Sequence, residues 1–170
     1  MEKKPFIFGV ATSGDNFTDR EKETSRLVLN FRHGVNTVLI SPRRWGKTSL
    51  VQKACRLAQS DKLKVVYIDI FSCRSDRDFY DAFASAILKQ TSSKLDEWLE
   101  HAKLFLSRIS PKISLGTDPM TDFSISLEMN PKSNEIDEIL QLPEKIAQKK
   151  GCNIVVCIDE FQQIAEFKDS

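Results

Sequence analysis

The stretch that decides the fold of this 170-residue chain is Val38-Leu39-Ile40-Ser41-Pro42-Arg43-Arg44-Trp45-Gly46-Lys47-Thr48. It has the form of the phosphate-binding loop G-x-x-x-x-G-K-[ST], which lies between a strand and a helix. Residues 36–40 predict a buried strand before the loop. Apolar residues at helical spacing predict the helix after it: Leu50, Val51, Ala54, Leu57 and Ala58. The motif therefore stands at a junction where backbone N–H groups and a helix N-terminus can bind phosphate.

Each residue of the loop has a predicted role. Lys47 is predicted to contact the β- and γ-phosphates of a nucleotide, and the Thr48 hydroxyl to ligate Mg²⁺. Gly46 would let the backbone approach the phosphates, because any Cβ there would crowd them. The other residues predicted to line the site are Ser41, Pro42, Arg43, Arg44, Trp45 and Ser49. The alternative is a chance G-K-T in a basic turn, which the flanking strand and helix argue against.

Ser41 departs from the motif, because it stands where the first glycine is expected. A serine there has a steric cost if the turn needs a positive φ. Pro42 also restricts Ser41 to extended geometry.

A second motif is Ile154-Val155-Val156-Cys157-Ile158-Asp159-Glu160, an apolar strand that ends in two carboxylates. Asp159 is predicted to hold Mg²⁺, directly or through water, and Glu160 to act as the general base toward the attacking water. The alternative is a buried strand that ends in an acidic turn. Together the two motifs predict ATP or GTP, bound with Mg²⁺ and hydrolysed. Adenine is favoured because the chain has no Asn-Lys-x-Asp guanine signature.

The chain resembles the N-terminal part of the ATPase domain of archaeal-type ATPases of the STAND group, which are related to AAA+ proteins. The resemblance covers nearly the whole chain, and its segments are Pro5-Phe6-Ile7-Phe8-Gly9, Phe17-Thr18-Asp19-Arg20-Glu21, Pro42-Arg43-Arg44-Trp45-Gly46-Lys47-Thr48-Ser49-Leu50 and Ile158-Asp159-Glu160-Phe161-Gln162. It implies a nucleotide-driven switch or motor module and places Phe17 and Arg20 beside the adenine. Family members often have glycine at the positions of Asp19 and Ser41. A solvated charge in a first helical turn is the alternative for Arg20.

The resemblance also implies that residues 1–170 form a single ATPase domain that is incomplete at its C-terminal end. In the ATPases that the chain resembles, the strand order is 5-1-4-3-2, and two strands follow the Asp-Glu strand. Only ten residues follow Glu160 here. A sensor residue, an arginine finger, a C-terminal effector domain or a protein partner would then lie outside the chain. The strand predicted at residues 36–40 would then lack a neighbouring strand. We expect this unpaired apolar edge to favour an oligomer, poor solubility or weak hydrolysis.

The rest of the pattern predicts a three-layer α/β P-loop fold with a mainly parallel sheet. Thr18 and Glu21 form a capping box before a first helix, and residues 64–70 predict a strand. Helices are predicted from Ser75 or Asp76, over residues 95–109, and from Ile136 to Gly151 with a break at Pro143. Alternating residues near 112–128 predict an inserted β-hairpin, either a docking element or a tolerated insertion.

Composition narrows the compartment and the partners. Lys and Arg number 25 against 24 Asp and Glu, so charge does not indicate nucleic acid or a membrane surface as a partner. The four cysteines form no C-x-x-C pair, which favours reduced thiols over a metal site. No apolar run has the length of a secretory or membrane-spanning segment, so we expect a cytoplasmic protein.

Two other functions remain open at this point. The first is a small-molecule kinase built on the same loop, against which Glu160 beside Asp159 argues by favouring the activation of water. The second is a nucleotide-binding scaffold that hydrolyses nothing, because no arginine finger or sensor is evident in the sequence.

Overall fold

The computed structural model describes residues 20–42, 44–92, 97, 100–101, 104, 112–115, 123–126 and 133–167. Phe17 and Arg43 therefore lie outside the described residues, as do Thr18, most of the helix predicted at 95–109 and the turn of the predicted hairpin.

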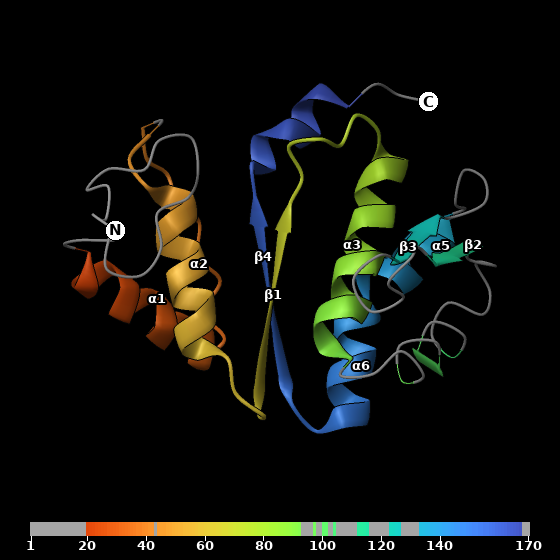
Figure 1. Ribbon diagram of the computed structural model, residues 1–170, viewed down its shortest axis with the longest axis horizontal. Coiled ribbons are helices and arrows are strands. Elements are labelled where there is room, and N and C mark those ends of the chain that lie inside the picture. The colour runs from red at the N-terminus through yellow and green to blue at the C-terminus, as the bar shows by residue number, and fades with distance from the viewer. Residues whose placement is uncertain are drawn as a thin grey trace, which may run out of the picture.

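Two parallel strands form the centre of the molecule (Figure 1). Strand β1 (Leu63–Asp69) pairs with β4 (Asn153–Asp159) in a register that sets Leu63 opposite Asn153 and Asp69 opposite Asp159. Both strands are near-continuous apolar runs, which is typical of parallel strands covered on both faces. Their carboxyl ends therefore lie side by side at one edge of the sheet, each ending in an aspartate.

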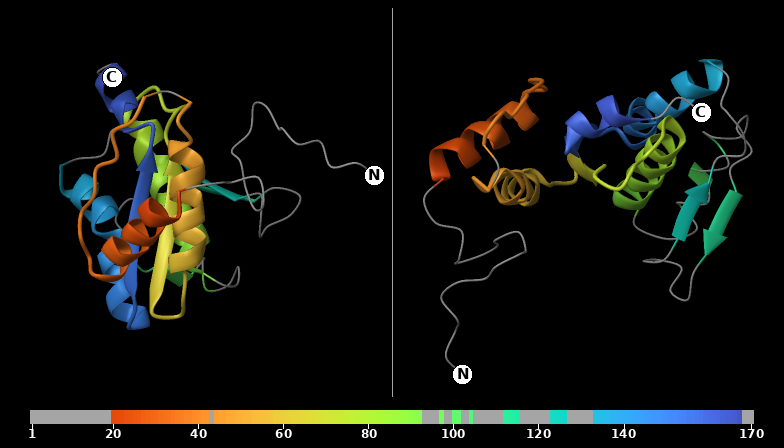
Figure 2. Two further views of the ribbon diagram at one scale, coloured as in Figure 1. Left: turned by 90° about the vertical axis from the view of Figure 1, so that its left-hand side faces the viewer. Right: turned by 90° about the horizontal axis from the view of Figure 1, so that it is seen from above.

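Helices cover both faces of this sheet (Figures 1 and 2). On one face lie α1 (Glu21–Arg32) and α2 (Lys47–Ala58), whose buried side chains include Leu27, Phe31, Leu50 and Ala54. On the other face lie α3 (Asp76–Thr91), α5 (Ser133–Leu140) and α6 (Leu142–Lys150), with a core that includes Val66, Ile68, Ile87, Ile139 and Ile146. The arrangement is compatible with an α/β domain of the P-loop kind.

Several predicted helix ends are confirmed. The Ser75 side chain caps α3 by accepting a hydrogen bond from the Asp78 amide at 3.2 Å. Gly151 caps α6 in the left-handed region at φ 63°, which suits glycine. The first helix differs from the prediction: α1 begins at Glu21 with Arg20 as its N-cap, so the capping box predicted at Thr18 and Glu21 does not fit. The Arg20 carbonyl accepts a hydrogen bond from the Thr24 amide at 2.9 Å, as an N-cap carbonyl does.

The predicted hairpin is confirmed in its two strands. Strand β2 (Lys112–Leu115) pairs antiparallel with β3 (Phe123–Ser126), and Ile113 lies opposite Ile125. This pair lies beside α3, on the side away from α1 and α2 (Figure 2).

The predicted strand at residues 36–40 is wrong. This segment has no strand pairing, and Val38 and Ile40 are 86% and 92% exposed. An apolar run becomes a strand only where a neighbour completes its hydrogen bonds, and within the described residues β1 and β4 pair only with each other. A groove of about 800 Å³ lies between this segment and β4.

Candidate functional site

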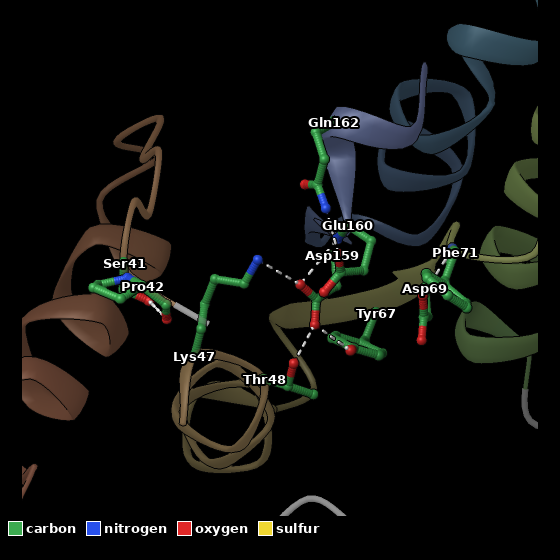
Figure 3. Close-up of polar contacts among 10 residues, drawn as sticks. All are labelled: Ser41, Pro42, Lys47, Thr48, Tyr67, Asp69, Phe71, Asp159, Glu160 and Gln162. Atoms are coloured by element: carbon green, nitrogen blue, oxygen red, sulfur yellow. Dashed lines mark hydrogen bonds and ion pairs between the residues drawn. The ribbon is translucent and has the colours of Figure 1, made fainter. Parts of the chain in front are cut away.

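Asp159, the last residue of β4, is the centre of the site, and only 6% of it is exposed. Its Oδ2 accepts hydrogen bonds from the Thr48 hydroxyl at 2.7 Å and from the Tyr67 hydroxyl at 2.8 Å. Its Oδ1 accepts from the Glu160 amide at 2.9 Å and lies 3.2 Å from Lys47 Nζ. Figure 3 shows these groups converging on one carboxylate from α2, β1 and the end of β4. Four donors therefore hold its orientation.

The same donors decide the charge of Asp159. Burial raises the pKa of this carboxyl group, because it disfavours the charged form. The hydrogen bonds from Thr48, Tyr67, the Glu160 amide and Lys47 favour the charged form and outweigh burial, so the pKa of Asp159 lies below its ordinary value. The group is therefore a carboxylate at neutral pH, which is the form that binds a cation.

Helix α2 places Lys47 and Thr48 because it begins at the loop. Gly46 is its N-cap with φ 70° and ψ 26°, and its carbonyl accepts from the Leu50 amide at 2.9 Å. A Cβ added at Gly46 would meet nothing within 4 Å, so the left-handed backbone, not the space around it, requires glycine there. Leu50 is 1% exposed, and its packing anchors the first turn of α2 over the sheet.

The strain expected at Ser41 lies elsewhere in the loop. Among the described non-glycine residues only Arg44 and Glu160 have a positive φ, at 66° and 57°. Ser41 is not among them, so the steric cost considered for a serine at this position does not arise, whereas the left-handed backbone at Arg44 costs about 1–3 kcal/mol. Pro42 is exposed beside Ser41, and Figure 3 shows both standing apart from the Lys47 side chain.

The remaining loop residues lie at different depths. Ser49 is buried in α2, whereas Trp45 is 68% exposed. The Trp45 carbonyl accepts a hydrogen bond from Arg20 Nη1 at 2.8 Å, and Arg20 Nε lies 3.2 Å from Glu23. Arg20 thus joins the start of α1 to the loop before α2.

Glu160 follows β4 and is the N-cap of the short 3₁₀-helix η2 (Phe161–Glu166). Its carboxylate accepts a hydrogen bond from the Gln162 side-chain amide. Its backbone lies in the left-handed region, where a non-glycine residue is strained, and such strain is concentrated at functional sites.

The groove beside β4 connects these groups to open space. Lys47, Asp159, Glu160 and Ser41 line it, together with mostly apolar residues of 34–40 and of β4. Its volume of about 800 Å³ is in the range of small-molecule sites, which combine apolar walls with a few polar groups.

Comparison with known proteins adds one match. Residues 17–170 match a family described as an ATPase domain predominantly from Archaea. The chain belongs to this family. Searches among curated proteins and solved structures give no match. Lys47, Thr48 and Asp159 therefore meet inside a P-loop ATPase-like domain.

Two side-chain oxygens of this ATPase domain are suitable ligands for Mg²⁺. Thr48 Oγ1 and Asp159 Oδ2 lie 2.7 Å apart, and Mg²⁺ in nucleotide sites takes one or two protein oxygens besides phosphates and water. Among the described residues, no three His, Cys, Asp or Glu side chains gather as a metal site made of protein groups alone. None of the described helices is long and apolar enough to cross a membrane.

Tyr67 is a site residue that the motifs did not indicate. It lies on β1 opposite Cys157, on the sheet face that α2 covers. Side chains alternate between the two faces of a strand, so the position of Tyr67 in β1 places it on the same face as Asp159. This could be deduced only once the register between β1 and β4 was known. Burial and then the Asp159 carboxylate raise the pKa of Tyr67, so its phenol stays protonated and acts as a donor.

Proposed function

We propose that this chain binds ATP with Mg²⁺ and hydrolyses it, as a nucleotide-driven switch or motor module of the STAND group. The observation that carries the proposal is the contact of Lys47 and Thr48, at the start of α2, with Asp159 at the end of β4. Membership of the archaeal-type ATPase family supports it. A cytoplasmic location belongs to the same proposal, and its support is the four free cysteines.

The proposed chemistry assigns one task to each polar group. Lys47 exchanges its contact with Asp159 for the phosphates, whose charge it stabilises as the phosphoryl group is transferred. Thr48 and Asp159 would hold Mg²⁺, which neutralises phosphate charge. Glu160 orients the attacking water and takes its proton. Arg20 keeps the loop backbone in place through the Trp45 carbonyl. Phe17, Arg20, the loop residues 41–46 and Ser49 are proposed as further nucleotide contacts.

A thermal-shift panel tests binding directly. Specific binding stabilises the folded state by about 2.7 kcal/mol at a ligand concentration 100 times Kd, and the unfolding temperature rises as a result. We expect ATP with Mg²⁺ to raise it more than ATP with a chelator or GTP with Mg²⁺. Equal, negligible shifts for all nucleotides would contradict the proposal.

Phosphate release separates the proposed ATPase from its two rivals. Release of free phosphate from ATP without an acceptor supports hydrolysis. Binding without any release supports a scaffold, and one observation favours that rival: the Gln162 side chain occupies the Glu160 carboxylate. Transfer of labelled phosphate to an added small molecule supports a kinase.

Asp159→Asn is expected to weaken the dependence of ATP binding on Mg²⁺. The change removes the carboxylate charge and replaces one of the two oxygens that accept hydrogen bonds from Thr48, Tyr67 and the Glu160 amide. Affinity for Mg²⁺ should fall roughly 10- to 100-fold, as for other changes around metal sites. Calorimetric titrations of ATP over a series of Mg²⁺ concentrations measure it.

Asp69→Asn is the matched control for that variant. Asp69 ends β1 opposite Asp159, but its carboxylate accepts from the Phe71 amide at 2.9 Å. The control should keep the Mg²⁺ dependence of the parent. An identical loss in both variants would show that Asp159 has no special role.

Tyr67→Phe is expected to raise the Mg²⁺ concentration needed for half-maximal ATP binding by several-fold. The variant removes one of the two donors to Asp159 Oδ2 and leaves the ring. Stability should fall by about 1.5–3 kcal/mol, because the lost hydrogen bond has a charged acceptor. The control is Tyr80→Phe on α3, whose ring packs at 5.5 Å on Phe79. A shift of the same size in the Tyr80 variant would contradict a positioning role for Tyr67.

A further inference from the structure

Two cysteines far apart in the sequence meet between α2 and β4. Cys55 Sγ lies 3.7 Å from Cys157 Sγ, and 102 residues separate them along the chain. Cys55 is 9% exposed, and Cys157 is partly buried. The other two cysteines of the chain are Cys73, which is buried in the core on the opposite face of the sheet, and Cys152, which precedes β4.

The thiol pair lies in the same contact between α2 and β4 as the Thr48–Asp159 hydrogen bond. Cys55 follows Thr48 by seven residues, close to two full turns, so both side chains lie on one side of α2. Cys157 precedes Asp159 by two residues, so both point to one face of the sheet. The packing that joins α2 to β4 at the site therefore also brings the two sulfurs together.

Both cysteines line hollows of the molecule. Cys55 lines a cavity of about 300 Å³ together with Gln52, Arg56 and Gln59. Cys157 lines the larger groove beside β4. A molecule of a few atoms can therefore approach the pair.

The two sulfurs are close enough that, once one of them is oxidised, the other can attack it. The thiolate is the form of cysteine that attacks an oxidant.

We propose that Cys55 and Cys157 form a reversible modification site, at which a peroxide oxidises the two thiols to a disulfide. The thiolate of one cysteine attacks one peroxide oxygen, the O–O bond breaks, and that cysteine becomes a sulfenic acid as hydroxide leaves. The thiol of the other cysteine then attacks the oxidised sulfur, the S–S bond forms, and water leaves. With hydrogen peroxide, two thiols and one peroxide give one disulfide and two waters. A disulfide bond of about 2.05 Å requires the sulfurs to approach by about 1.7 Å.

This site does not depend on ATP chemistry. Its consequence is mechanical: the bond would tie the helix that begins with Lys47 and Thr48 to the strand that ends in Asp159. A dithiol such as dithiothreitol would reverse the bond by exchange.

Peptide mapping of the oxidised full chain tests the proposal without any variant. The chain is treated with hydrogen peroxide at a small molar excess, remaining thiols are alkylated, and the linked peptides are identified by mass spectrometry. We expect the four free thiols to fall to two, with a Cys55–Cys157 link that dithiothreitol removes. Unchanged thiols, irreversible oxidation of Cys55 alone, or a link to Cys73 or Cys152 would overturn the proposal.

Serine variants and stability provide the second readout. Cys55→Ser and Cys157→Ser should each abolish the link, whereas Cys73→Ser and Cys152→Ser should keep it. Oxidation should raise the unfolding temperature of the parent by roughly 5–15 °C, because the bond closes a long loop. The same rise in Cys55→Ser would show that the link has no part in it. Failure of ATP binding or hydrolysis would leave these results untouched.

Discussion

Lys47→Ala is expected to reduce ATP affinity below detection. The substitution removes the positive charge that is proposed to contact the phosphates and leaves Asp159, which is 6% exposed, without its ionic partner at 3.2 Å. Truncating one member of a buried, hydrogen-bonded charge pair at a binding site costs about 2–5 kcal/mol, or roughly 30- to several-thousandfold in affinity. Isothermal calorimetry with ATP and Mg²⁺ measures the effect.

Lys53→Ala is the matched control, because Lys53 lies on the same helix but not in the site. It should bind ATP like the parent. We expect both variants to fold, because the N-cap at Gly46 and the buried side chains of α2 are unchanged. Circular dichroism of both variants checks this. Equal ATP affinity in Lys47→Ala and in the parent would remove the loop from the proposed site.

Glu160→Gln is expected to bind ATP with Mg²⁺ normally and to hydrolyse it about 10²- to 10⁴-fold more slowly. Glutamine keeps the shape of the side chain and the left-handed backbone at φ 57°, but it cannot accept the proton of the attacking water. The loss should therefore appear in kcat and not in the affinity for ATP. Steady-state phosphate release and calorimetry on the same sample separate the two quantities.

Glu166→Gln is the control for this variant. Glu166 ends the same 3₁₀-helix, and its carboxylate accepts from the Gln163 side chain at 3.2 Å. It should turn over ATP at the parent rate. If Glu160→Gln also reached the parent rate, another group would have to serve as the base.

The sequence predicted most helices and strands because their patterns are local. The spacing after Lys47 predicted α2, and the apolar runs predicted β1 and β4 within one or two residues. The meeting of Thr48 with Asp159, 111 residues apart, followed from motif chemistry, since a loop for phosphate and a carboxylate for its cation must share a site. That contact was predictable without any knowledge of packing.

The misses concern contacts between segments. Residues 36–40 have the composition of a strand, but composition does not supply the neighbour that a strand needs. Tyr67 and the thiol pair depend on the register of β1 against β4 and on the rotation of α2 over the sheet. Neither the register nor the rotation can be deduced from the residues of one segment alone.

The alternation of side chains along β4 determines both how the strand packs in the core and the face on which Asp159 lies. Val155 and Cys157 pack against the cluster under α2, while Ile154, Val156 and Ile158 pack against the cluster under α3 and α6. Deleting one residue within β4 would exchange the two sets and turn Asp159 away from Thr48. Deleting two would shorten the strand but keep the alternation. The strand should therefore tolerate many apolar replacements, yet odd-numbered insertions and deletions would remove folding and chemistry together, so its length is constrained more tightly than its composition.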